Sequence, residues 1–233
     1  MQAELLDSPN VSASLLVKNL RELDFLNRVT GGHAISLEGI KKLLTVKSRV
    51  YHIVDLGCGS GDLMRFVAEW AKKEGFKIQL TGVDKNADAI RYLKLKSSTF
   101  PEIQYFTGDY REFLNHSRVD IFHCALFCHH LTDEELVELL RHMNTAAELG
   151  FVINDLQRNR FAYYGAKMMT TILGGSSLSK HDGPVSVLRG FNKKELKLIL
   201  KEAGVANYHV LHRPFFRLLA IGRNGATQGG YTT

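Results

Sequence analysis

The chain has 233 residues, of which 45% are hydrophobic, and this is enough for a real core in one domain or in a domain with an appendage. Its net charge of +6 is compatible with a nucleic-acid partner, but the basic residues are scattered over predicted helix faces, so we expect none. No apolar stretch approaches the roughly 20 residues that cross a bilayer, and the N-terminus lacks a signal-peptide pattern, so we expect a cytoplasmic protein without a membrane span.

Residues 11–46 have no strand character and predict two helices, separated by a break at Thr30-Gly31-Gly32-His33. We expect residues 1–46 to form an N-terminal helical cap. Its leucines at helical spacing are more typical of packing than of ligand recognition. Arg28 and His33 are the candidates in this segment for contact with a substrate.

A glycine-rich turn, Asp55-Leu56-Gly57-Cys58-Gly59-Ser60-Gly61, separates a predicted strand at 50–55 from a predicted helix at 62–74. Glycines let the backbone approach a ligand closely, and the free N–H groups of the following helix point at that ligand. A dinucleotide fingerprint has its third glycine three residues beyond the second, whereas this turn has the spacing G-x-G-x-G. It also places Asp55 ahead of the first glycine, which disfavours a pyrophosphate and suits the sulfonium and ammonium groups of S-adenosylmethionine.

The turn resembles, residue for residue, the first motif of the class I methyltransferases that use S-adenosylmethionine. The resemblance implies S-adenosylhomocysteine as the product of the cofactor. It also implies cofactor contacts for the residues of the turn and the first residue of the next helix, namely Asp55, Gly57, Cys58, Gly59, Gly61 and Asp62.

An alternation of strands and helices follows the turn. Strands are predicted at 78–84, 103–107, 119–127 and 151–155, with helices at 86–97, 110–115 and 133–148. Asn86 caps one of these helices, and Thr132 with Glu135 forms a capping box for another. Strands separated by helices form parallel crossovers, so the chain predicts an α/β fold.

The alternation resumes near the C-terminus with a helix at 192–202 and strands at 208–212 and 215–221. Only Arg213-Pro214 joins the two strands, which predicts an antiparallel hairpin at the edge of the sheet. By resemblance we expect a three-layer, doubly wound, Rossmann-like sheet of seven strands with the last strand antiparallel. The methyltransferase domain would span residues 47–222, and residues 223–233 would form a flexible tail.

The ends of the later strands carry further candidates for the cofactor site. Asp84 ends the second strand, where an acid accepts hydrogen bonds from both ribose hydroxyls, and Lys85 follows it. The resemblance places Asp109 against the adenine amino group and Tyr110 over a face of the purine. It also implies that the backbone around Leu126 lines the methionine end of the cofactor.

Several acceptor classes are disfavoured by missing motifs. The fourth predicted strand is not followed by the Asn/Asp-Pro-Pro-aromatic run of the amino-group DNA methyltransferases, and the chain has no Pro-Cys nucleophile. The acidic set that holds magnesium in catechol-type enzymes is also not apparent. The cysteines Cys58, Cys124 and Cys128 show no metal-ligand spacing. We therefore expect a small-molecule acceptor and no metal.

Three histidines are candidates for a catalytic base. Methyl transfer is an in-line displacement that depends mainly on alignment, with a base needed only to ionise the acceptor. A phenol with a pKa of about 10 can give its proton to an imidazole with a pKa near 6.5. His129 and His130 follow the fourth strand, although this pair also suits a role in shaping the pocket. His181 is the alternative, although Asp182-Gly183-Pro184 after it is typical of a turn.

Residues 157–188 interrupt the alternation after the fifth strand, and their mixture of bulky apolar groups and glycines predicts a lid over the site. Tyr163 and Tyr164 in this insertion are candidates for substrate contact. Asp155, at the end of the fifth strand, faces the same predicted pocket and is placed to orient a histidine or to cap local backbone.

Four segments, 27–33, 127–136, 151–156 and 181–184, together resemble bacterial small-molecule methyltransferases of phenolic polyketide metabolism and, more distantly, those of quinone biosynthesis. The resemblance covers about residues 20–222. It implies O-methylation of a phenolic or polyketide-derived acceptor in secondary metabolism. C-methylation of a quinone-type aromatic precursor, an RNA substrate, and cofactor binding without turnover stay open, as does the choice between a monomer and a homodimer.

Overall fold

The carboxyl ends of five parallel strands meet at one edge of a seven-stranded sheet in the computed structural model, which describes residues 4–7, 11–114, 119–172 and 174–224. The elements in chain order are η1 (Leu5–Asp7), α1 (Ala13–Val29), α2 (Gly32–Leu43), β1 (Val50–Leu56), α3 (Asp62–Glu74), β2 (Lys77–Asp84), α4 (Ala87–Lys96), β3 (Ile103–Thr107), α5 (Tyr110–Leu114), β4 (Val119–Ala125), η2 (Cys128–His130), α6 (Asp133–Ala146), β5 (Ala147–Leu156), α7 (Arg160–Ile172), α8 (Ser177–Arg189), α9 (Lys193–Glu202), β6 (Tyr208–Arg213) and β7 (Arg217–Arg223).

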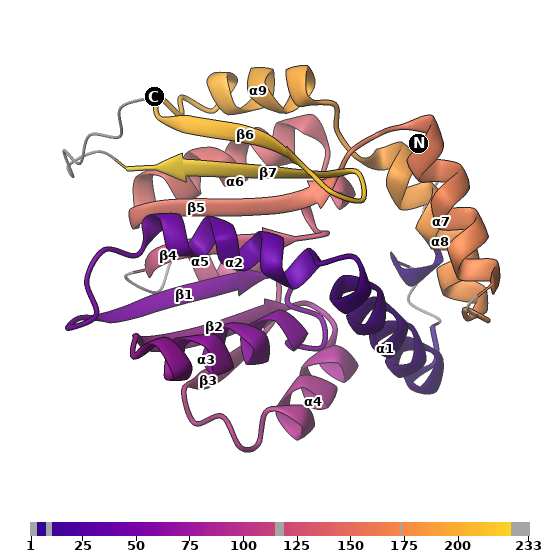
Figure 1. Cartoon of the computed structure of the whole chain (residues 1–233), viewed down its shortest axis with the longest axis horizontal. Helices are drawn as coiled ribbons and strands as arrows, with labels where there is room; N and C mark the ends of the chain where they lie inside the picture. The colour runs from indigo at the N-terminus through magenta and orange to yellow at the C-terminus, as the bar shows by residue number, and fades with distance from the viewer. Residues whose placement is uncertain (1–3, 8–10, 115–118, 173, 225–233) are drawn as a thin grey trace.

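The strand order is β3-β2-β1-β4-β5-β7-β6, with β7 antiparallel to both of its neighbours (Figure 1). This order confirms the predicted doubly wound, Rossmann-like sheet of seven strands with an antiparallel last strand. The order reverses between β1 and β4, and ligands of such sheets bind in the crevice outside this switch point. The caps predicted at Asn86 and at Thr132 with Glu135 are also present.

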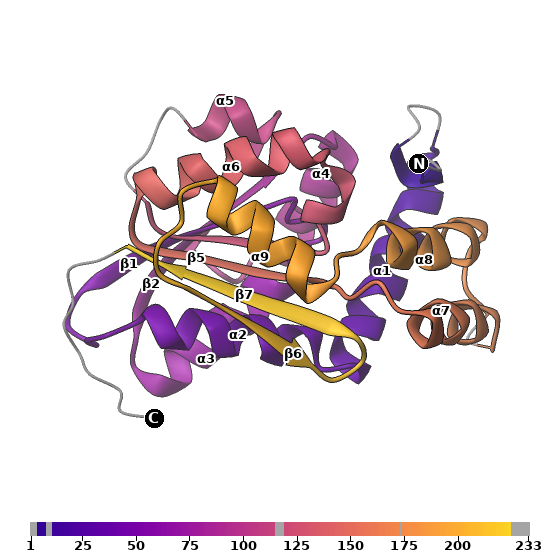
Figure 2. The same ribbon diagram turned by 90° about the horizontal axis from the view of Figure 1, so that it is seen from above.

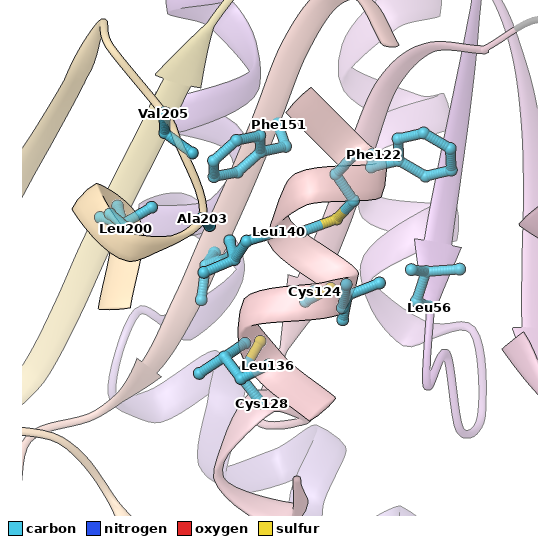
Figure 3. Packing of buried hydrophobic residues seen from close by; sticks show 14 of the residues in the cluster. Leu56, Phe122, Cys124, Cys128, Leu136, Leu140, Phe151, Leu200, Ala203 and Val205 are labelled. Carbon is cyan, nitrogen blue, oxygen red and sulfur yellow. The ribbon is translucent and has the colours of Figure 1, made fainter. Parts of the chain in front are cut away.

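Helices cover both faces of the sheet and make three layers. Figure 2 shows α2 and α3 on one side of the sheet and α5 and α6 on the other. The core between α6, α9 and the sheet contains Phe122, Phe151, Leu136, Leu140 and Leu200, all at most 1% exposed (Figure 3). Burial of one such side chain stabilises the fold by about 1.5–3 kcal/mol, so this core fixes the strand ends on which the site depends.

The two N-terminal helices have different surroundings. Ile40 and Leu43 of α2 are buried in the core, and a Cβ at Gly39 would lie 2.5 Å from Val152 Cγ1 of β5. This close approach makes α2 a layer of the sheet domain, so the predicted boundary at residue 46 does not separate it from that domain. In contrast, α1 lies beyond the carboxyl ends of the strands, beside α8 (Figures 1 and 2).

The insertion predicted as a lid consists of two helices, α7 and α8, packed against each other. Asp182-Gly183-Pro184 lies inside α8, so the turn expected there is wrong. Ser176 accepts a hydrogen bond from the N–H of Ser179 at the start of α8, and burial of Leu178, Val185 and Val187 outweighs the poor helix propensity of glycine and proline.

The C-terminal end of the described chain belongs to the sheet. Arg223 is the last residue of β7, so the predicted tail begins later than residue 223, and residues 225–233 lie outside the described residues. Among the helices that the structure describes, none combines the length and apolar character needed to cross a membrane.

Candidate active site

A cavity of about 390 Å³, called here the strand-end cavity, lies at the carboxyl ends of β1, β2, β3 and β4. Of the residues predicted to bind the cofactor, all but Gly61 line it, namely Asp55, Gly57, Cys58, Gly59, Asp62, Asp84, Lys85, Asp109, Tyr110 and Leu126. Four strand ends therefore contribute to one hollow, as parallel strands with a common carboxyl edge require.

The glycine-rich turn has a backbone that other residues adopt only with strain. Gly57 has φ of +70°, and its N–H donates to the carbonyl of Val83 at 2.8 Å. A Cβ at Gly57 would lie 2.3 Å from Cδ2 of Phe127, which is closer than real contacts allow. Gly61 caps α3 with φ of +67°, and as a glycine it has no side chain to accept from the first N–H groups of the helix.

Asp84 is a partly buried acceptor at the end of β2. Its Oδ2 accepts from the N–H of Gly59 and its Oδ1 from the N–H of Asn86, each at 2.9 Å. Burial raises the pKa of Asp84. The two hydrogen bonds and the positive charge of the nearby Lys85 partly oppose this rise. A carboxylate held in this way keeps lone pairs for donors in the cavity, such as the two hydroxyls of a ribose.

A buried hydrogen-bond network orients Asp55. His123 Nδ1 lies 2.7 Å from Asp55 Oδ1, and its Nε2 lies 3.0 Å from Ser36 Oγ. The Nδ2 of Asn154 donates to Ser36 Oγ and to the carbonyl of Gly32, each at 2.9 Å. Asn154 Oδ1 is buried and has no hydrogen-bond partner among the described residues. Asn154 lines the strand-end cavity, so the wall of this cavity contains a buried acceptor that requires an explanation.

Asp62 and His33 form a second polar pair in the strand-end cavity, with 2.6 Å between Asp62 Oδ2 and His33 Nε2. Burial alone would raise the pKa of Asp62, but the hydrogen bond with His33 and that from Ser60 hold it below its usual value. His33 therefore lies on the side predicted for the cofactor, and its contact with a substrate stays a prediction.

Asp109 and Tyr110 have different environments on the far side of the strand-end cavity. Arg111 forms an ion pair with Asp109 at 3.3 Å, and its N–H also donates to the Asp109 carboxylate. Tyr110 is buried edge-on against Phe127, with ring centroids 5.6 Å apart. Burial raises the pKa of Tyr110 to about 12, so its ring supplies a neutral surface.

A second cavity of about 320 Å³, called here the lid cavity, adjoins the first. Its walls come from α1, α7, α8, the segment around residues 4–6 and the turn between β6 and β7, and they are mainly apolar, as with Leu26, Leu156, Met169, Val187 and Phe215. The two cavities share a boundary formed by Leu6, Leu23, Asn27, Leu126 and His130. Leu126 has φ of +52°, a strained conformation that tends to occur at functional sites.

His129 and Asp155 form a buried dyad beside the lid cavity. The distance from His129 Nδ1 to Asp155 Oδ1 is 2.6 Å, and the backbone N–H groups of His129 and Leu156 also donate to Asp155. Burial alone would raise the pKa of Asp155, but the adjacent His129 holds it below its usual value. An ionised Asp155 keeps the proton of His129 on Nδ1, which leaves Nε2 as an acceptor on the cavity side.

The helix α8 and the N-terminal segment hold this histidine loop in place. Arg189 donates to the carbonyls of His129 and His130 at 3.0 and 2.9 Å. Asp182 accepts the backbone N–H groups of Leu5 and Leu6 at 2.8 and 2.9 Å. These contacts join three parts of the chain that are far apart in sequence, and local sequence patterns do not reveal them.

Several predicted residues line neither cavity. Arg28 is exposed and paired with Asp24 one helical turn away, and Tyr163 contacts the exposed Tyr164 on α7. His181 also lines neither cavity, and its Nδ1 contacts Asp182. By contrast, the leucines at helical spacing in α1 do more than pack, because α1 lies across both cavities. Four of them line a cavity wall, namely Leu16, Leu20, Leu23 and Leu26.

Two groups of side chains within the described residues have ligand atoms close enough to hold a metal ion. In one of them, Glu4 lies 3.6 Å from His129 Nε2 and 3.7 Å from His130 Nε2. The other combines Asp24 with the hydrogen-bonded pair of His33 and Asp62. Two histidines and a glutamate also form the ligand set of some catalytic zinc sites, so the first group requires an experimental test.

Comparison with known proteins agrees with the geometry. Residues 53–150 match a family model described as a methyltransferase domain. No curated protein sequence matches the chain.

Many solved structures share the fold. The plantazolicin methyltransferase BpumL in complex with SAH has a TM-score of 0.67 and 15% identity, with 91% of this chain and 94% of that chain covered. Human N-acetylserotonin methyltransferase in complex with SAM has a TM-score of 0.61 and 15% identity, and a candidate O-methyltransferase from Nostoc punctiforme has 0.60 and 14%. The matches cover 92% and 88% of this chain, but it spans only 57% and 60% of those two proteins.

The matched domain holds the strand ends at which Asp55, Asp84 and Asp109 meet in one cavity. Residues 53–150 of the chain match the methyltransferase-domain family, and its seven-stranded sheet with an antiparallel last strand is the fold of the class I methyltransferases.

Proposed function

We propose that the chain transfers the methyl group of S-adenosylmethionine to a hydroxyl group of a small phenolic or polyketide-derived acceptor. The cofactor would occupy the strand-end cavity and the acceptor the lid cavity. The observation that carries this proposal is the shared boundary between a cavity rich in carboxylates and a mainly apolar one. In-line transfer requires the sulfonium and the acceptor atom to meet across such a boundary.

The acid-lined cavity fits the charges of the cofactor. Asp84 is placed to accept from the ribose, and the unpartnered Oδ1 of Asn154 would accept from the ammonium group. Asp55 adds a carboxylate that His123 holds in position. S-adenosylhomocysteine lacks the sulfonium charge after transfer, which weakens its attraction to these groups relative to the cofactor.

His129 is the proposed general base. Asp155 fixes its tautomer, so that Nε2 can accept the proton of an acceptor hydroxyl as the new bond to the methyl group forms. His130, which lines both cavities, would contact the acceptor near the transferred methyl group. The mechanism needs no metal, because the proton goes to the imidazole and the methyl group goes directly from sulfur to oxygen.

The proposal is tested by incubating the protein with labelled S-adenosylmethionine and a panel of phenols, quinone precursors and RNA. Label on the oxygen of a phenol supports it, and the position of the label is read by mass spectrometry and NMR of the product. Label on ring carbon would instead establish C-methylation, which uses the same two cavities. Label on RNA alone, or cofactor binding with no transfer, would refute the proposal.

The reaction is further proposed to belong to cytoplasmic secondary metabolism. All three cysteines are buried free thiols, as expected in a reducing compartment. An acceptor of polyketide origin would suit the apolar wall of the lid cavity.

A further inference from the structure

Arg217 is a buried cation on the wall of the lid cavity. It opens β7, and only 5% of its surface is exposed. Its Nη2 donates to Oδ1 of Asn27 at 2.8 Å, whereas its Nη1 is buried and has no hydrogen-bond partner among the described residues. Buried polar groups are nearly always hydrogen-bonded, so this donor requires an explanation.

The two acids on the wall of the lid cavity, Glu4 and Asp182, are engaged elsewhere. Glu4 on the cavity wall accepts from Ser186 at 2.9 Å, and Asp182 is engaged by the backbone of residues 5 and 6. Burial lowers the pKa of Arg217 to about 10, and the charge of Asp155 opposes this fall. The guanidinium therefore stays protonated at neutral pH, and no carboxylate in the described part of the chain neutralises it through a direct ion pair.

The guanidinium lies close to the boundary between the cavities. Asn27, its hydrogen-bond partner, lines both of them. A Cβ placed on Gly32, which lines the strand-end cavity, would lie 3.2 Å from Arg217 Nη2. Around this single buried guanidinium, most of the lid cavity is apolar, with side chains such as Leu26 and Phe215. A ligand that fits would have an apolar body and one negatively charged end.

We propose that the acceptor binds as an anion, with a negatively charged oxygen that accepts a hydrogen bond from Nη1 of Arg217. This inference rests on the proposed function and narrows its acceptor class. The oxygen belongs either to a carboxylate beside the methylated hydroxyl or to that hydroxyl itself in its ionised form. In the second case Arg217 holds the reacting phenolate, whose proton has passed to Nε2 of His129 before the methyl group is transferred.

The test measures binding without turnover, by calorimetry on the protein saturated with S-adenosylhomocysteine. Four probes separate the sources of charge: benzoate carries a carboxylate, benzamide is its neutral counterpart, 4-nitrophenol ionises at slightly alkaline pH, and phenol stays neutral. Tighter binding of benzoate than of benzamide by about 10- to 100-fold supports a carboxylate, given the usual strength of hydrogen bonds to charged groups. The same preference for nitrophenolate over phenol supports an ionised hydroxyl.

Arg217→Gln should remove either preference while leaving affinity for S-adenosylhomocysteine unchanged. Arg217→Lys keeps the positive charge and should retain part of the preference for charged over neutral probes. It also provides a second test if Arg217→Gln destabilises the fold. Arg213→Gln is the matched control, because Arg213 is on the same hairpin but pairs with Glu38 outside the cavity. Equal affinity of the wild-type protein for charged and neutral probes would overturn the inference. A preference for charged probes together with no methylation of any phenol would support the role of Arg217 and refute the phenolic acceptor of the proposed function.

Discussion

Replacement of Asp155 by asparagine tests the proposed base without changing the shape of the site. In the wild-type protein the dyad distance of 2.6 Å and the ionised carboxylate keep the proton of His129 on Nδ1. The side-chain amide that Asp155→Asn introduces can instead donate to Nδ1, and the proton then moves to Nε2, where it blocks acceptance of the substrate proton. A positioned general base contributes about 100- to 10,000-fold, so kcat on a phenol should fall by at least about 100-fold.

The assay is steady-state transfer of labelled methyl, combined with calorimetry of S-adenosylhomocysteine binding. Affinity for the cofactor product should not change, because Asp155 does not line the strand-end cavity. Asp120→Asn is the matched control: Asp120 is also a buried carboxylate, but it accepts from the backbone N–H of His52 near the opposite end of the sheet. Wild-type kcat in a folded Asp155→Asn variant would refute the role of the dyad, and an equal loss in both variants would indicate general destabilisation.

Further predictions concern the turn, the pH dependence of stability, the lid and a metal. Gly57→Ala should lower the thermal midpoint more than Gly75→Ala. Both glycines have positive φ, a conformation that costs residues with a side chain about 1–2 kcal/mol. Only at Gly57 would the new Cβ also clash with a ring, that of Phe127 at 2.3 Å. The folded protein holds the pKa of Asp62 below its unfolded value of about 3.9 despite the burial of this group, so ionised Asp62 stabilises the fold above that pH. This stabilisation is lost as the pH falls through the folded pKa. In urea titrations, the difference in unfolding free energy between the wild-type protein and Asp62→Asn should therefore shrink below about pH 4. His181→Ala should leave kcat near the wild-type value, because His181 lines neither cavity, and a large loss would restore it as a candidate base. Extensive treatment with a chelator should leave turnover unchanged, and recovery of lost activity by zinc would contradict the metal-free mechanism.

Much of the strand-end cavity was predictable from the sequence, because many of its lining residues follow strands. An apolar run indicates each strand, and parallel strands bring their carboxyl ends to one edge of the sheet. The meeting of Asp84 and Asp109 with the turn at Asp55 can therefore be predicted without information on long-range contacts. The seventh strand was predictable from the short link at Arg213-Pro214, although β7 is inserted beside β5 rather than lying at the edge.

The lid cavity was far less predictable. Glu4 meets His129, and Asn27 meets Arg217, through contacts that span more than a hundred residues and leave no local pattern. Asp182 is in a helix because of tertiary burial and a good N-cap, which propensity alone does not include. Arg217 was missed because an arginine at the start of a strand normally lies in solvent.

The lid cavity has a consequence for how the acceptor preference of such enzymes can change. The matched methyltransferase domain covers residues 53–150, and it contributes only Leu126, His129 and His130 to the wall of the lid cavity. The remaining wall comes from the chain before and after that domain, including α1, α7 and α8. Under the proposed function, most of the acceptor wall is thus encoded outside the matched domain, although α1 contributes to both cavities. A chimera that exchanges α7 and α8 between two such enzymes could therefore exchange their acceptors while the transfer machinery stays the same.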